Sequence, residues 1–267
     1  PATPSPDHHG TPGWGLPVGY RQGPHTSSHS RVTHTLLRGD DMGILDGKVG
    51  IITGAARGIG KGMATALAKE GMAVTITDIL AEELAATGEE LRAQGLKVLD
   101  IVADGCSDEQ VNTAVQRTVD EFGGIFLLVN NAQGSVTNIE LQDQTVAQVA
   151  VRIDSAFYSS FRYMKACFPY LQESHGTVVN FGSQAGLIGN WGMVGYNAAK
   201  EANRALTRTA AREWGPYNIT VNTIIPGMLT ERSKEFFEAN PEHAANSLSN
   251  IPMGRLGNPE LEIGSLL

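Results

Sequence analysis

A chain of 267 residues with 41% hydrophobic residues can bury one large core or two small ones. Its formal net charge of −8 and isoelectric point of about 5.4 argue against a nucleic-acid-binding surface. There is no apolar run of about 18 residues and no apolar stretch after a basic N-terminus, so we expect a cytoplasmic protein that does not bind membranes. The two cysteines, Cys106 and Cys167, lack metal-ligand spacing and fit a reducing compartment, and we expect no metal site.

Residues 1–41 differ in composition from the rest of the chain. They are rich in Pro, Gly, Ser, Thr and His and show no apolar periodicity. Such a segment cannot bury enough apolar surface to offset the entropy lost on ordering, so we expect a disordered extension. The predicted domain therefore covers residues 42–267 and begins at Met42.

From Lys48 onward the chain alternates between strand-like and helix-like patterns. Apolar, β-branched runs predict strands at residues 49–52, 73–77, 98–102, 125–129, 177–181 and 219–225. Helical periodicity predicts helices at residues 61–70, 81–93, 108–122, 146–173 and 196–214. This alternation predicts a single α/β domain of the Rossmann type, a doubly wound parallel sheet between two layers of helices.

A glycine-rich turn links the first predicted strand to the first predicted helix. It reads Thr53-Gly54-Ala55-Ala56-Arg57-Gly58-Ile59-Gly60. Glycines let the backbone turn tightly and approach a pyrophosphate, which the free N–H groups and the dipole of the helix N-terminus attract. A P-loop is excluded because no Gly-Lys-Ser/Thr follows. The position of the turn therefore predicts a dinucleotide site.

The choice between the two nicotinamide dinucleotides depends on Asp78 and Arg57. Asp78 ends the second strand, where a carboxylate can accept hydrogen bonds from the adenosine ribose and repel a 2′-phosphate. Two alternatives remain: Asp78 caps the next helix, or Arg57 meets a 2′-phosphate and favours NADP. Because repulsion between like charges at hydrogen-bonding range is costly, we expect NAD, with NADP possible.

Three later residues have the chemistry of a hydride-transfer site. Tyr196 and Lys200 are four residues apart and share one helix face, and Ser183 follows the fifth strand. The pKa of a free tyrosine is about 10, and an ammonium beside the ring stabilises the phenolate and lowers it. We expect Tyr196 to exchange a proton with the oxygen of a secondary alcohol or ketone. Ser183 would hold that oxygen, while hydride passes between the substrate carbon and the nicotinamide.

Taken together, these motifs resemble the short-chain dehydrogenase/reductase family. The resemblance runs from Lys48 to the C-terminus. Its matching segments are Thr53 to Gly60, Asp104, Asn130-Asn131-Ala132, Ser183, Tyr196-Asn197-Ala198-Ala199-Lys200 and Pro226-Gly227. The resemblance implies a Rossmann-type fold, a nicotinamide cofactor and a small-molecule alcohol or ketone as substrate. It also implies a homodimer or homotetramer.

The resemblance assigns further roles at the cofactor site. Asn131 would brace the central sheet and, with Ala132, line the pocket. Asp104 would contact the adenine edge, with helix capping as the alternative. Lys200 would also bind the nicotinamide ribose. The remaining expected cofactor contacts are Gly54, Arg57, Gly58, Ile59, Gly60, Asp78, Tyr196, Pro226, Gly227 and Thr230.

The sequence departs from the family pattern at three places. Gln133 replaces a usual glycine and either faces the substrate or is a tolerated loop change. A usual helix asparagine is replaced by Ala156, counted back from Pro169, or by Arg152, matched on Phe157. The chain also stops before the family's final edge strand. These departures leave open a catalytically weak or inactive dinucleotide-binding protein, or a structural partner subunit.

The substrate class is suggested only by the candidate pocket residues, which are mostly apolar. These are Gln133, Gln184, Ile188, Trp191, Met193, Met228, Leu229, Phe236 and Phe237. Such a set suits a 3-oxoacyl, hydroxysteroid or small cyclic ketone substrate. The mixed polar and aromatic segment 230–249 is predicted to form a lid over it.

Overall fold

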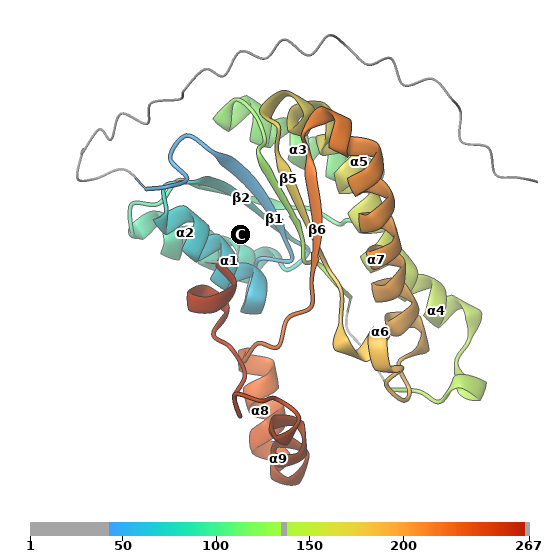
Figure 1. The fold of residues 1–267 in the computed structure, drawn as a ribbon. Coiled ribbons are helices and arrows are strands. Elements are labelled where there is room, and N and C mark those ends of the chain that lie inside the picture. Colours follow the sequence, from blue (N-terminus) through green and yellow to red (C-terminus); the bar gives the residue numbers. More distant parts are fainter. Residues whose placement is uncertain (1–42, 135–137, 265–267) are drawn as a thin grey trace, which may run out of the picture. The chain divides into compact units, whose positions relative to one another are not determined.

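The computed structural model describes residues 43–134 and 138–264, so the expectation for residues 1–41 lies outside the described part. Six strands form one parallel sheet in the order β3-β2-β1-β4-β5-β6 (Figure 1). Their bounds are β1 Val49–Thr53, β2 Ala73–Asp78, β3 Val98–Val102, β4 Leu127–Asn130, β5 Thr177–Phe181 and β6 Thr220–Ile224. The predicted parallel sheet is confirmed, and the strand order reverses between β1 and β4, where such sheets bind ligands.

Helices connect the strands as the periodicity predicted. Their bounds are α1 Gly58–Lys69, α2 Ala81–Ala93, α3 Asp108–Phe122, α4 Val146–Ile153, α5 Ser159–Ser174, α6 Gln184–Ile188, α7 Val194–Trp214, α8 Glu231–Ala239 and α9 Pro241–Ser249. The predicted bounds of α2 and α3 agree with the structure at both ends. The segment predicted as a lid is folded into α8 and α9, which lie beyond the carboxyl end of β6 (Figure 1).

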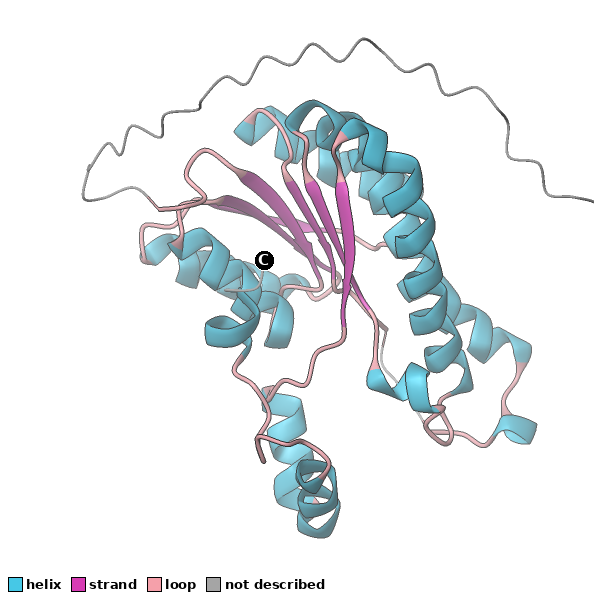
Figure 2. Ribbon diagram, viewed as in Figure 1, coloured by secondary structure: helices cyan, strands magenta, loops and turns pink. Residues whose placement is uncertain are grey.

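Helices lie on both faces of the sheet (Figure 2). On one face, Met63 and Leu67 of α1 and Leu84 of α2 pack in a single cluster with strand side chains. On the other face, α3, α5 and α7 pack in a second cluster that includes Tyr163 and Leu171. Both faces are covered, which explains why the strands are apolar without alternation.

The long helix predicted over residues 146–173 is interrupted. A single π-helical turn, η2 (Asp154–Tyr158), separates α4 from α5. The carbonyl of Ala156 in this turn accepts a hydrogen bond from the Ser160 hydroxyl, which accepts one from the Asn203 side chain of α7. Periodicity could not predict this interruption, because tertiary hydrogen bonds to α7 accompany it. Insertions of this kind occur often at functional sites.

The last described segment packs against the first helix. A second π-helical turn, η4 (Pro259–Ile263), places Ile263 in the core beside α1. Gly62 permits this approach, because a Cβ there would lie 2.6 Å from Pro259 Cβ. Within the described residues, β6 pairs with β5 on one side and has no strand on the other.

The described residues contain neither a membrane-spanning helix nor a cluster of metal-ligating side chains. None of their helices is long and apolar enough to cross a membrane. Nor do three or more His, Cys, Asp or Glu side chains among them gather in a way that could hold a metal ion.

Candidate active site

A cleft of about 940 Å³ opens at the carboxyl ends of the central strands. A volume of this size suits a dinucleotide. The structure brings together ten of the predicted site residues along its lining: Gly54, Arg57, Gly58, Ile59, Asp78, Asp104, Asn131, Ala132, Tyr196 and Thr230. Five predicted residues are not part of that lining: Gly60, Ser183, Lys200, Pro226 and Gly227.

The glycine turn forms the floor of the cleft. Gly54 has a φ of +65°, and a Cβ there would lie 2.7 Å from the Ala132 Cα, so only glycine fits. Gly58 begins α1 with a φ of +59°. The first turn of α1 contains no acidic residue and its N-cap, Arg57, makes no side-chain capping bond. Its N–H groups therefore remain available to an anion such as a pyrophosphate.

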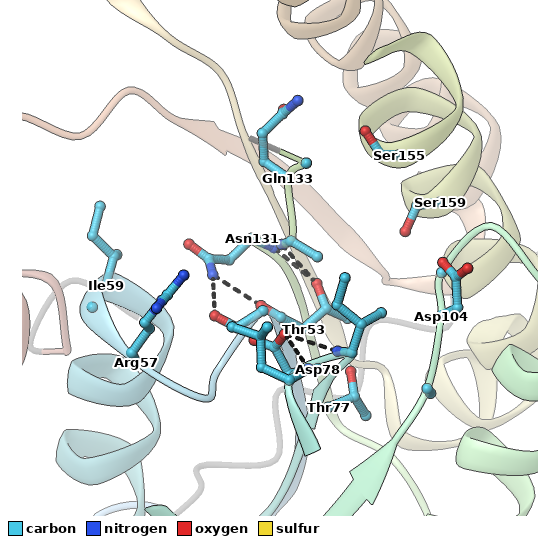
Figure 3. A pocket seen from close by; sticks show the side chains of 18 of the residues that line it. Thr53, Arg57, Ile59, Thr77, Asp78, Asp104, Asn131, Gln133, Ser155 and Ser159 are labelled. Atoms are coloured by element: carbon cyan, nitrogen blue, oxygen red, sulfur yellow. Dashed lines mark hydrogen bonds between the residues drawn. The ribbon is translucent and has the colours of Figure 1, made fainter. Parts of the chain in front are cut away.

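Asn131 holds this turn in place. Its side-chain amide donates to the carbonyls of Thr53 and Gly54, both at 2.9 Å (Figure 3). Its backbone N–H donates to the Thr53 hydroxyl, which itself donates to the Val129 carbonyl. Thr53 thus links β1 to β4, a role that no sequence pattern indicates beyond its place at a strand end.

The Asp78 carboxylate accepts hydrogen bonds from the backbone of two segments. One oxygen accepts from the Ala56 N–H at 3.1 Å, and the other from Ile79 and Leu80 at 2.8 and 3.2 Å. Asp78 therefore supports the entry into α2 and the glycine turn together. Arg57 is the residue that would favour NADP. Its Nη1 lies 3.6 Å from the Glu83 Oε1.

Asp104 lines the cleft and does not cap the next helix. Ser107 caps α3 by accepting from the Gln110 N–H, so the capping alternative for Asp104 is wrong. The Asp104 carboxylate instead accepts from the Cys106 N–H at 2.9 Å. Burial, followed by the negative charges of Asp104 and Asp154, raises the pKa of the Cys106 thiol to about 11.

The opposite end of the cleft holds Tyr196. The Lys200 Nζ lies 5.7 Å from the centre of its ring, so the two share a helix face as predicted. Lys200 is only 4% exposed, and burial lowers the pKa of its amine to about 8. No described residue accepts a hydrogen bond from this amine.

Ser183 lies beside this end as the N-cap of α6. Its Oγ accepts from the Ala185 N–H at 3.1 Å, and α6 packs against α7. Because the hydroxyl accepts from the backbone, its own O–H remains free to donate to a substrate oxygen.

Gln133 has an unusual environment at the cleft. The nitrogen and oxygen of its side-chain amide are buried and have no hydrogen-bond partner among the residues that the structure describes. In Figure 3 the side chain points away from Asp78 and Asp104. The polar residues that line the cleft without having been predicted include Ser155, Ser159, Glu231 and Glu235. They lie in or beside η2 and in α8, and no motif distinguishes them.

The expected apolar substrate residues lie outside the cleft lining. Of that set only Gln133 lines it, and the side chain of Phe236 lies outside the described residues. Ile188 and Trp191 are each 67% exposed, and Leu229 is 42% exposed. Ile188 ends α6, Trp191 lies in the loop after α6, and Leu229 precedes α8.

Comparison with known proteins identifies the family. Residues 48–241 match the family described as short chain dehydrogenase. The chain belongs to this family. It is 46% identical over 230 residues to the 12alpha-hydroxysteroid dehydrogenase of a Clostridium species, covering 84% of this chain and 89% of that protein.

Other short-chain dehydrogenases are similar as well. The 3-oxoacyl-(acyl-carrier-protein) reductase FabG of Pseudomonas aeruginosa is 34% identical over 220 residues, covering 81% of this chain and 87% of that protein. The crystal structure of gox2181 superposes with a TM-score of 0.77 at 32% identity, covering 83% of this chain and 87% of that one. As a short-chain dehydrogenase, the protein is an NAD(P)-dependent oxidoreductase that interconverts alcohols and ketones.

Proposed function

We propose that this short-chain dehydrogenase uses NAD to interconvert a secondary alcohol and a ketone, with Tyr196 as the acid/base. One observation carries the proposal. A single cleft contains the glycine turn at one end and Tyr196 at the other, with the buried Lys200 amine beside the ring. A phosphate cradle and a proton-exchanging group thereby line the same cleft.

The residues present fit that cofactor. The uncapped N-terminus of α1 and Gly54 leave room and N–H groups for the pyrophosphate. Asp78 would accept from the adenosine ribose hydroxyls, and Asp104 would bond the adenine edge. Asn131, Ala132, Thr230 and the segment Pro226-Gly227 would border the nicotinamide half. When bound, the nicotinamide supplies or accepts the hydride.

The chain's own side chains would move the proton. In ketone reduction the Tyr196 hydroxyl gives its proton to the substrate oxygen, and in alcohol oxidation the phenolate takes it back. The Lys200 ammonium favours the phenolate. The Ser183 hydroxyl donates a hydrogen bond to the same oxygen, which fixes the reacting carbon in place.

The preference for NAD over NADP rests on charge at the adenosine end. Asp78 presents a carboxylate that backbone N–H groups hold in position, so it cannot easily turn away from a 2′-phosphate. Arg57 is the opposing cation, and its guanidinium is close to Glu83. This arrangement supports NAD as the preferred cofactor.

We further propose an alicyclic, steroid-like ketone as substrate. Leu187, Ile188 and Trp191 expose apolar surface near Ser183, and large apolar side chains left in water often mark a binding surface. The relative named as a 12alpha-hydroxysteroid dehydrogenase supports a fused-ring substrate. A 3-oxoacyl thioester is the second candidate, favoured by the similarity to FabG.

A cofactor and substrate panel tests the proposal. Purified protein is mixed with NADH or NADPH and with an oxosteroid, a 3-oxoacyl thioester or cyclohexanone, and the nicotinamide absorbance is followed. We expect the highest kcat/KM with NADH and the oxosteroid. A higher value with NADPH contradicts the cofactor assignment, and a higher value with the thioester contradicts the substrate assignment. Turnover of none of them indicates the inactive alternative, which the absence of a polar side chain at Ala156 would then explain.

A further inference from the structure

The cleft has one basic side chain among its described lining residues. This is Arg57, at the N-cap of α1. The same lining carries four carboxylates: Asp78, Asp104, Glu231 and Glu235. An additional phosphate on the cofactor adds negative charge to a cleft that is already acidic. Among the described lining residues, Arg57 is therefore the one cation that could compensate the charge of a 2′-phosphate.

A carboxylate outside the lining competes for this cation. The Glu83 Oε1 lies 3.6 Å from the Arg57 Nη1. Glu83 belongs to the first turn of α2, which starts immediately after Asp78, Ile79 and Leu80. An acidic residue is favourable in a first helical turn, so α2 itself holds Glu83 at this place. The pairing thus comes from the same strand-to-helix connection that presents Asp78.

We propose that Glu83 is a cofactor-selectivity residue, and this inference rests on the proposed nicotinamide site in the cleft. By pairing with Arg57, Glu83 withholds the cleft's cation from a 2′-phosphate. Asp78 acts differently, because it repels the phosphate directly. Selectivity for NAD then has two separate sources. The Asp78 carboxylate faces the ribose, and the Glu83 carboxylate neutralises the Arg57 guanidinium.

The solvent exposure of the Arg57 and Glu83 side chains sets the expected size of the effect on NADPH binding. The Arg57 and Glu83 side chains are 66% and 48% exposed. Ion pairs in such surroundings change equilibria by about two- to five-fold, and salt screens them. Loss of Glu83 should therefore strengthen NADPH binding by about two- to five-fold at low salt and leave NADH binding unchanged.

A double-mutant cycle measures this coupling without any substrate. The dissociation constants of NADH and NADPH are obtained by fluorescence titration for the wild type, Glu83→Gln, Arg57→Ala and the double variant. We expect Glu83→Gln to improve NADPH binding in the wild-type background and to have no effect in the Arg57→Ala background. A gain that persists without Arg57 overturns the proposal, because Glu83 would then act by simple repulsion.

A neighbouring glutamate provides the control. Glu82 lies in the same first turn of α2 and makes no ion pair within the described residues. Glu82→Gln should leave the ratio of the NADPH and NADH dissociation constants unchanged. If Glu82→Gln improves NADPH binding as much as Glu83→Gln does, the proposal is overturned. A wild-type preference for NADPH contradicts only the proposed NAD preference, since the coupling is measured independently. If neither NADH nor NADPH binds, the proposed nicotinamide site and the proposed role of Glu83 are both overturned.

Discussion

The two ends of the cleft satisfy their polar groups in different ways. At the glycine-turn end, Asn131 and Asp78 bond backbone groups from several segments. At the Tyr196 end, Lys200 is only 4% exposed and its amine donates no hydrogen bond to another described residue. The Gln133 amide, which also lines the cleft, is buried without a partner among the described residues. One end is thus complete within the chain, while the other contains polar groups that the chain leaves unpaired.

Because of this difference, substitutions at the two ends of the cleft should change the stability of the protein in opposite directions. Removing a paired group at the glycine-turn end should weaken the fold, because its partners are left unsatisfied. Removing an unpaired group at the Tyr196 end should strengthen the fold, because its burial is a cost. Active sites often carry such a cost, and stabilising changes there reduce function. The following variants test this distinction.

The largest effect is expected at Tyr196 and concerns activity alone. Tyr196→Phe should lower kcat by at least about 100-fold, the usual worth of a positioned acid/base group. The ring remains, so the dissociation constant for the cofactor should stay the same. Steady-state kinetics and a cofactor titration measure the two quantities. Near-normal turnover in this variant would remove Tyr196 from the mechanism.

Lys200→Met should stabilise the protein while reducing activity. Burial lowers the pKa of Lys200 to about 8 from an ordinary 10.5, so at pH 7 the folded state carries a buried charge. Methionine removes it, and the free energy of unfolding should rise by about 3 kcal/mol at pH 7.

The stability gain of Lys200→Met should decrease as the pH rises. Between pH 8 and 10.5 the folded protein loses the Lys200 proton before the unfolded chain does, so the wild type gains stability relative to the variant. The advantage of Lys200→Met should shrink across this window in urea unfolding experiments. Lys165→Met, at an exposed position of α5, is the control. A constant or growing difference would contradict the assigned cause.

Asn131→Ala should act in the opposite direction. It removes two hydrogen bonds to the Thr53 and Gly54 carbonyls, each worth about 1 kcal/mol. The free energy of unfolding should fall by about 2 kcal/mol, which denaturant titration measures. Asn112→Ala, at an exposed position of α3, should have little effect. If Asn131→Ala were as stable as the wild type, the glycine turn would not depend on this side chain.

The smallest effect is expected for Gln133→Leu. Leucine is apolar and similar in size, so it removes two buried, unpaired polar atoms without opening a cavity. The melting temperature of the ligand-free protein should rise, by the equivalent of about 1 kcal/mol. Gln133→Glu is the matched opposite, because it buries a charge at the same position and should lower the melting temperature. A loss of stability in Gln133→Leu would show that the amide has a partner.

The sequence by itself determined the strands, most helices and the glycine turn. Apolar runs and helical periodicity depend on neighbouring residues, so the bounds of α2 and α3 could be predicted. The turn between β1 and α1 is equally local, because tight backbone geometry there requires glycine.

Only the tertiary structure decided how the site is bonded. The Asn131 bonds to β1, the Arg57–Glu83 pair and the unpaired Gln133 amide join residues from different segments. The π-helical turn η2 likewise appears only with its contacts to α7. Sequence periodicity describes the faces of single elements, whereas hydrogen bonds and ion pairs depend on which faces meet after folding. That physical difference explains why the helix face shared by Tyr196 and Lys200 could be predicted while the polar environment of the cleft could not.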